Sequence, residues 1–204
     1  MIKELPLDKF KNIYFNHMIY DFPENELKLF DMIEDIIKKR KGLAIAYYQN
    51  NILTGYATLI FVEDKLLLDY FAIIKDFRNM GYGKKFIKEL QEYFHDYAFL
   101  LIESEDNDSI QAKKRIEFYK RCGCKDSGIK IELYFVDYAL LYLELNKQID
   151  INIKEEVLSI YKNVYPNYIG SNYLIFKNYI KKIKLFVNIL NLILAQVIFP
   201  WYYY

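Results

Sequence analysis

The chain has 204 residues, of which 53% are hydrophobic and 18% aromatic, and its formal net charge is +1. This length suffices for one well-buried α/β domain with an appendage, and the apolar content excludes an intrinsically disordered chain. The near-neutral charge provides no field that would favour nucleic acid or an acidic membrane surface as a partner.

Residues 1–61 are predicted to form two helices followed by a hairpin. The segment MIKELPLDKF has no apolar run of the signal-peptide kind, so we expect a cytoplasmic protein. Hydrophobic residues recur twice at helical spacing and then in two extended runs joined by Gln49-Asn50-Asn51, a composition typical of a hairpin turn. The predicted helices and strands cover residues 7–19, 24–41, 43–48 and 52–61.

A third strand, residues 66–74, ends in a glycine-containing turn that opens into a helix over residues 84–97. Such a junction points several backbone N–H groups and the positive end of a helix dipole at one spot, which suits a pyrophosphate. The turn is not a Walker A loop, because Gly83-Lys84-Lys85 lacks the first glycine and the hydroxyl residue. Phe86 stands where a dinucleotide-binding loop has its third glycine. A tight turn that binds nothing is the alternative.

The chain then continues as strand, helix and two more strands. Residues 98–105 have the pattern of a buried strand that ends in carboxylates, and residues 109–122 that of a helix with Gly123 at its C-cap. The last two strands are expected over residues 128–133 and 135–145. This alternation of strands and helices predicts parallel pairing in this part of the sheet.

Two motifs in this region resemble the GNAT family of N-acetyltransferases. The turn has the sequence Arg78-x-x-Gly81-x-Gly83, which resembles that family's acetyl-CoA pyrophosphate loop. The later helix ends in Tyr119-x-x-x-Gly123, which resembles its second signature, and the two occur in the family's order. The resemblance implies an α/β GNAT fold, with a mixed central sheet and helices on both faces.

The resemblance also implies a function. It predicts acetyl-CoA-dependent transfer of an acetyl group to a primary amine of a small molecule or peptide, by direct attack in a ternary complex. The acceptor would lie near residues 21–25 and 134–138, but the sequence does not identify it. Cys122 and Cys124 follow the tyrosine helix and predict no acetyl-enzyme, and without a histidine cluster they predict no metal site. A catalytically idle acyl-CoA-binding module of the same fold is the alternative.

The contacts with acetyl-CoA follow from the resemblance. The pantetheine arm is expected in a gap between two splayed strands, against the main chain of Phe71, Ala72 and Ile73. The pyrophosphate loop is expected to comprise Arg78, Asn79, Met80, Gly81, Tyr82, Gly83 and Lys84. Arg78 and Lys84 fit charge-assisted contacts to phosphate, and they also fit ordinary solvated surface charge. Ala112 stands where many members have a cofactor-binding asparagine, and Asn107 is expected to replace it.

Three residues are expected to carry the chemistry. By resemblance, the Tyr119 hydroxyl faces the thioester sulfur and assists departure of the CoA thiolate. Because a thiol near pKa ~8.5 is a stronger acid than a phenol near ~10, we expect Tyr119 to act mainly as a hydrogen-bond donor. Glu103, on the same strand face as Glu105, is the first choice for the base, and Asp69 is the second. A water-relayed proton is the alternative.

The C-terminal part departs from the family. Residues 1–150 are expected to form the acetyltransferase core, and residues 151–204 an extension with a short helix over 152–165. An apolar, helical tail is expected from Tyr173 to Phe199. It is expected to pack on the core or on a second subunit as a homodimer contact, and contact with a membrane, interfacial or spanning, is the alternative.

Overall fold

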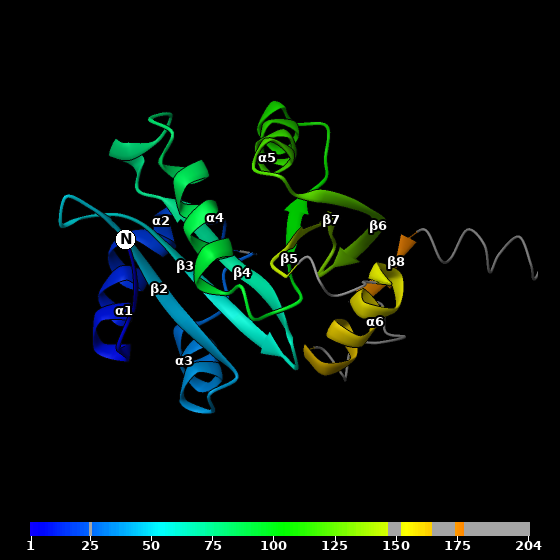
Figure 1. Ribbon diagram of the computed structural model, residues 1–204, viewed down its shortest axis with the longest axis horizontal. Helices are drawn as coiled ribbons and strands as arrows, with labels where there is room; N and C mark the ends of the chain where they lie inside the picture. The colour runs from blue at the N-terminus through cyan, green and yellow to red at the C-terminus, as the bar shows by residue number, and fades with distance from the viewer. Residues whose placement is uncertain (25, 147–151, 165–173, 178–204) are drawn as a thin grey trace, which may run out of the picture.

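The computed structural model describes residues 1–24, 26–146, 152–164 and 174–177. The strands of these residues form one sheet in the order β1-β2-β3-β4-β5-β7-β6-β8 (Figure 1). The strands are β1 (Ile2–Glu4), β2 (Gly42–Gln49), β3 (Ile52–Val62), β4 (Lys65–Ile73), β5 (Phe99–Glu105), β6 (Lys125–Leu133), β7 (Val136–Glu144) and β8 (Leu174–Phe176). Only β4 and β5 pair in parallel among these described strands.

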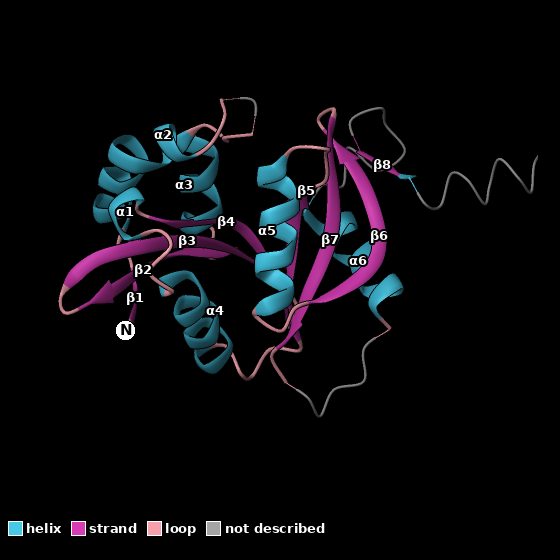
Figure 2. Ribbon diagram, turned by 90° about the horizontal axis from the view of Figure 1, so that it is seen from above, coloured by secondary structure: helices cyan, strands magenta, loops and turns pink. Residues whose placement is uncertain are grey.

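Helices cover both faces of the sheet, as the resemblance implies. The helices are α1 (Leu7–Ile13), α2 (Ile19–Asp21), α3 (Phe30–Lys38), α4 (Tyr82–Tyr93), α5 (Ile110–Arg121) and α6 (Ile153–Val164). α4 and α5 lie on one face (Figure 2). On the opposite face, α1 and α3 pack over β2 to β4, and α6 packs against residues of β3, β4, β5, β6 and β7. A π-helical segment, Tyr14–Met18, joins α1 to α2, so the first predicted helix is confirmed with one irregularity.

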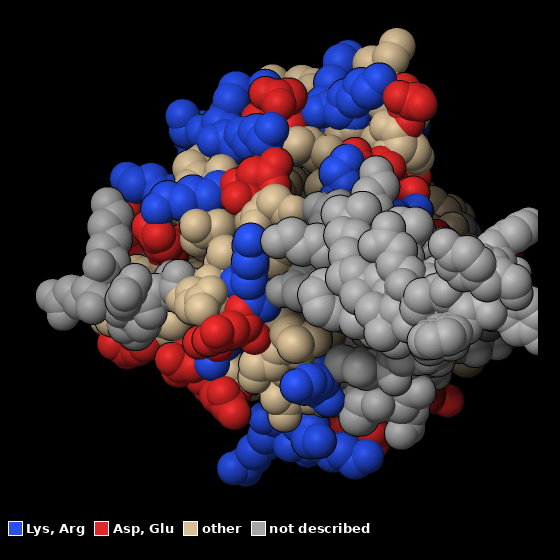
Figure 3. Space-filling view, turned by 90° about the vertical axis from the view of Figure 1, so that its right-hand side faces the viewer, with Lys and Arg blue, Asp and Glu red and all other residues tan. Residues whose placement is uncertain are grey.

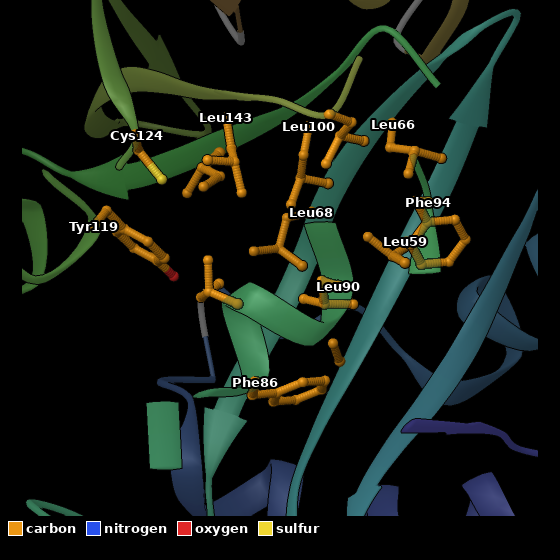
Figure 4. Packing of buried hydrophobic residues seen from close by; sticks show 14 of the residues in the cluster. Leu59, Leu66, Leu68, Phe86, Leu90, Phe94, Leu100, Tyr119, Cys124 and Leu143 are labelled. Atoms are coloured by element: carbon orange, nitrogen blue, oxygen red, sulfur yellow. The ribbon is translucent and has the colours of Figure 1, made fainter. Parts of the chain in front are cut away.

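The apolar residues of α4 pack on the sheet as their spacing predicts. The helix buries Phe86, Ile87 and Leu90. These side chains pack with Leu66 and Leu68 of β4 (Figure 4). Because each fully buried side chain of this kind contributes roughly 1.5–3 kcal/mol, this interface fixes the start of α4 relative to β4.

A β-bulge at Asp69 lies where β4 begins to diverge from β5. The register of β3 against β4 shifts by one residue between Thr58 and Leu59, so Asp69 is an extra residue on β4. The parallel ladder with β5 is limited to Leu66–Leu68 against Leu100–Ile102, and β4 diverges from β5 after it. A bulge bends a strand and increases its twist, which accounts for the divergence.

The helix predicted over residues 24–41 begins only at Phe30, and the residues before it form a loop. The Tyr70 hydroxyl binds this loop, because it accepts a hydrogen bond from the Lys28 N–H and donates one to the Glu26 carbonyl, each at 2.8 Å. Tertiary hydrogen bonds therefore satisfy backbone groups that a longer helix would have paired internally.

The prediction of parallel pairing is correct for β4 with β5 and wrong for the strand that follows. β7 lies between β5 and β6 and pairs antiparallel with both. β6 and β7 are joined by a tight turn in which Tyr134 and Phe135 have positive φ angles of 49° and 66°. The alternating pattern of a hairpin does not specify which of its strands joins the sheet, so the sequence could not decide this order.

The C-terminal extension joins the sheet where the structure describes it. β8 pairs antiparallel with β6, so the helical prediction is wrong for Leu174–Phe176. The rest of the tail and the boundary near residue 150 lie outside the described residues, and their predictions stay predictions. In the part of the chain that is described, none of the helices combines the length and apolarity that a bilayer crossing needs. On the side nearest α6 and β8, basic and acidic side chains are interspersed (Figure 3).

Candidate active site

A cleft of about 1510 Å³ opens where β4 leaves β5. Its walls come from β4, the first turn of α4, one face of α5, the loop before α3 and the β6–β7 turn. The predicted site residues on its wall are Asp69, Phe71, Ala72, Ile73, Arg78, Asn79, Gly81, Gly83, Lys84, Glu103 and Tyr119. The predicted residues outside its wall are Met80, Tyr82 and Asn107.

The first turn of α4 has the geometry of an anion site. Gly81 is the N-cap with a φ of 80°, and none of the described side chains caps the helix. The first intrahelical bond runs from the Lys85 N–H to the Gly81 carbonyl at 3.3 Å, so the N–H groups of Tyr82, Gly83 and Lys84 have no helical acceptor. A Cβ on Gly81 would meet no atom within 4 Å, so the space in front of the turn is open.

α5 forms the wall opposite α4, and the two helices approach closely. A Cβ on Gly83 would lie 3.0 Å from the Phe118 ring, so a larger residue would require the ring to shift. The predicted ends of α5 are confirmed. The Ser109 hydroxyl accepts a hydrogen bond from the Ala112 N–H at 3.0 Å, and Gly123 follows the helix with a φ of 96°.

Tyr119 projects from α5 into the cleft wall. Its side chain is only 6% exposed, and its ring contacts Phe118 and Phe71 with centroid distances of 5.2 and 6.3 Å. Figure 4 shows its hydroxyl oxygen pointing away from Cys124 and toward the β4 side. The hydroxyl makes no hydrogen bond within the described ranges. Burial raises the pKa of Tyr119, although the positive charge of Arg115 opposes the effect.

Arg78 is bound to protein groups near the mouth of the cleft. Its Nε donates to the Ile73 carbonyl at 2.8 Å, and its guanidinium pairs with the Asp21 carboxylate. The Tyr56 hydroxyl donates to the same carboxylate at 2.7 Å. Arg78 therefore ties α2 to the end of β4, and its contact to phosphate stays a prediction. Lys84 is exposed on the cleft wall.

Glu103 lies on the opposite face of the sheet from α5, deep in the cleft wall. Its Oε1 accepts a hydrogen bond from the Tyr161 hydroxyl of α6. Burial raises the pKa of Glu103 above its ordinary value, the Tyr161 hydrogen bond and the Lys28 ammonium oppose this, and Asp69 adds to it. A carboxylate with a raised pKa is a stronger base, which suits the role predicted for it.

Two further predicted site residues, Asp69 and Asn107, are engaged in polar contacts. Asp69, whose side chain is 3% exposed, forms an ion pair with Lys28. Asn107 donates to Glu105 at 2.6 Å and accepts from the Ser109 N–H at 2.9 Å, so it holds the turn before α5. A carboxylate that neutralises an ammonium is less available as a base, so Glu103 remains the first choice.

Sequence reasoning missed Lys28 and Tyr161, and it placed Tyr138 only within the expected acceptor region, residues 134–138. Lys28 and Tyr138 lie on the cleft wall beside the carboxylates, and Tyr161 contacts Glu103 from behind. Tyr161 lies on the apolar face of α6 with Val157 and Ile160, where spacing alone marks it as a core residue. A hydroxyl on an otherwise apolar face was the available clue, because buried hydroxyls usually find a partner.

Comparison with known proteins gives one family and one fold. The sequence pattern of the acetyltransferase (GNAT) family matches residues 7–124. Among curated proteins, none matches the chain. A GNAT-family acetyltransferase from Bacteroides thetaiotaomicron superposes with a TM-score of 0.64 at 19% identity, over 81% of this chain and 98% of that chain.

Two further solved structures share the fold. The ribosomal-protein-S18-alanine N-acetyltransferase from Escherichia coli has a TM-score of 0.58 at 16% identity, over 75% of this chain and 97% of that chain. The spermidine N-acetyltransferase from Vibrio cholerae, in complex with CoA and spermine, has a TM-score of 0.55 at 13% identity, over 71% and 95%. At these identities the likeness shows the fold alone.

Proposed function

The chain belongs to the acetyltransferase (GNAT) family and is an acyltransferase enzyme, and we propose that it transfers the acetyl group of acetyl-CoA to a primary amine. The observation that carries the proposal is the arrangement around the cleft. The uncapped start of α4 and the Tyr119 hydroxyl lie on one face of the sheet, and Glu103 lies on the other. The cleft where β4 leaves β5 is lined from both faces.

The residues present fit acetyl-CoA. The open space before Gly81 and the N–H groups of the first turn of α4 suit a pyrophosphate, and the helix dipole adds to their effect. Among the described strands, none pairs with β4 on its β5 side beyond Leu68, so the main chain of Phe71 and Ala72 suits an extended pantetheine arm. The Ile73 carbonyl accepts a hydrogen bond from Arg78, which the arm would have to share or displace. Acetyl-CoA supplies the activated acetyl thioester.

Glu103 is proposed to accept the proton of the amine. A primary amine of pKa ~10.4 is protonated at neutral pH, and freeing its lone pair costs roughly 4–5 kcal/mol at pH 7. Because burial raises the pKa of Glu103, its carboxylate is a better proton acceptor than an exposed one. Asp69 is the second candidate.

Tyr119 is proposed to donate a hydrogen bond to the charge that develops on the departing thiolate. Its hydroxyl has no acceptor in the described part of the chain, so it is available for this contact. Burial raises its pKa further above that of a thiol, which makes full proton transfer less favourable and a hydrogen bond the larger part of its role.

A cationic amine is the proposed acceptor class. The carboxylates of Glu26, Asp69 and Glu103 line the cleft, where Asp69 pairs with the Lys28 ammonium and the Arg115 charge acts on Glu26. Burial and the nearby Glu105 charge raise the pKa of Glu26, the effect expected where carboxylates share a site. The neighbours named for a ribosomal-protein alanine and for spermidine support a choice between peptide N-termini and polyamines.

The test is a panel of polyamines, aminoglycosides and peptide N-termini incubated with acetyl-CoA, with release of the free CoA thiol as the signal. We expect acetylation of at least one amine and its loss in Tyr119→Phe, with Tyr20→Phe, an exposed tyrosine, as the matched control. Tight acetyl-CoA binding without acetylation of any amine would favour the idle acyl-CoA-binding module. Absence of acetyl-CoA binding would contradict the proposal altogether.

A further inference from the structure

We propose that Tyr161 of α6 is a positioning residue of the active site, which holds the Glu103 carboxylate in place for proton acceptance. This inference rests on the proposed function of Glu103. α6 lies outside the residues that match the family pattern, 7–124, so the C-terminal extension would complete a site that the matched residues do not.

The contact is direct. The Tyr161 hydroxyl donates to Oε1 of Glu103, and the Tyr161 side chain is 0% exposed. Its ring also packs edge-on against Phe176 of β8, with centroids 5.5 Å apart. A tyrosine held this firmly loses little conformational entropy in making its hydrogen bond, so it fixes the carboxylate more effectively than a mobile surface group.

α6 is attached to the sheet at a second, separate point. The buried ammonium of Lys65 pairs with Glu156 of α6 at 3.1 Å, and with Glu63 and Asp64 of the β3–β4 turn. Val157 and Ile160 add apolar contacts. The Lys65 ion pair anchors the helix without touching Glu103, so the helix can be weakened at one contact while the other is left intact.

The groups around Glu103 define what Tyr161 contributes. Among the residues that the structure describes, the charged and titratable side chains that face the carboxylate are Tyr161 of α6, Lys28 of the loop before α3, Asp69 and Tyr70 of β4, and Tyr138 of β7. Burial raises the pKa of Glu103 and Asp69 adds to it, whereas the hydrogen bond from Tyr161 and the charge of Lys28 lower it. Tyr161 therefore helps to keep Glu103 ionised, and so able to accept a proton, at lower pH.

Tyr161→Phe in the full-length chain tests the proposal, since it removes the hydroxyl and retains the ring. The first readout is the pKa of the Glu103 carboxyl, which is measured by a ¹³C NMR titration. The Glu103 resonance is assigned by its absence in Glu103→Gln. The second is the pH dependence of kcat/KM for an amine identified in the panel. We expect the carboxyl pKa to rise by about 1–2 pH units, the effect of losing one hydrogen bond to a charged group. The acidic limb of the kcat/KM profile, where activity falls as Glu103 is protonated, should move to higher pH by the same amount.

Glu156→Gln is the matched control, because it weakens the attachment of α6 at Lys65 and leaves the Tyr161 contact in place. It should lower Tm and leave the Glu103 titration and the acidic limb unchanged. An unchanged carboxyl pKa in Tyr161→Phe, or an equal shift in both variants, would overturn the proposal. So would a shifted carboxyl pKa with an unmoved acidic limb.

The carboxyl titration needs no turnover, so it separates this inference from the proposed function. If wild-type protein acetylates no amine, the proposed function fails, and the role of Tyr161 in catalysis fails with it even where its contact with Glu103 is confirmed. If Glu103→Gln retains full activity, only the assignment of the base is wrong.

Discussion

Replacing Tyr119 with phenylalanine should separate catalysis from stability. The side chain is 6% exposed, and its hydroxyl makes no hydrogen bond to the rest of the described chain. Because no protein hydrogen bond is lost, we expect the free energy of unfolding to change by no more than about 0.5 kcal/mol.

The expected loss of activity is much larger. A phenol of pKa ~10 is a weaker acid than a thiol of pKa ~8.5, and that difference corresponds to roughly 2 kcal/mol against full proton transfer. Burial raises the pKa of Tyr119 and enlarges this cost, which leaves hydrogen bonding to the departing thiolate as its main contribution. Removing one such donor typically lowers kcat by about 10²–10³, and we expect a loss in this range for Tyr119→Phe.

The assay is release of the CoA thiol at saturating acetyl-CoA, repeated across pH, together with denaturant unfolding of both proteins. We expect no basic limb from Tyr119 below about pH 10, because its raised pKa keeps the phenol protonated. A kcat close to the wild-type value would refute the role of the hydroxyl. A basic limb below that pH which disappears in Tyr119→Phe would refute the argument against proton transfer.

Three further predictions concern the cleft. Gly83→Ala should lower the free energy of unfolding by about 1–3 kcal/mol, since its Cβ would lie 3.0 Å from the Phe118 ring; unchanged denaturant unfolding would mean that the ring moves aside. Asp69→Asn removes the charge paired with Lys28 and should lower Tm. A Lys28→Met/Asp69→Asn double variant should regain part of the loss, and full additivity of the Tm changes of the two single variants would contradict this coupling. Burial raises the pKa of Glu103 above its unfolded value near ~4.3, so its contribution to stability is complete below that pH and is lost as the pH rises through the folded pKa. Glu103→Gln should therefore gain stability relative to wild type as the pH rises above about 4, and a pH-independent difference in thermal unfolding would argue against it.

Much of the fold could be predicted from the sequence, because several helices are marked by strong local patterns. The apolar spacing of Phe86, Ile87 and Leu90 predicted α4 and its buried face. Ser109 and Gly123 marked both ends of α5, since a hydroxyl and a glycine suit those backbone positions. The glycines at the start of α4 indicated a phosphate-binding turn, because glycine suits the backbone conformation and close approach that such a turn requires. Each of these signals depends on residues within a few positions of one another.

What only the tertiary structure decided involves residues distant in the chain. The bulge at Asp69 parts β4 from β5, and no pattern in β4 alone shows it. The Tyr70 hydroxyl holds residues of the loop before α3 in place of the predicted helix. Tyr161 reaches Glu103 across 58 positions of sequence. The sequence by itself thus determined the elements, their caps and the family, whereas the cleft and the surroundings of its carboxylate arise from pairing and packing, which local propensity does not specify.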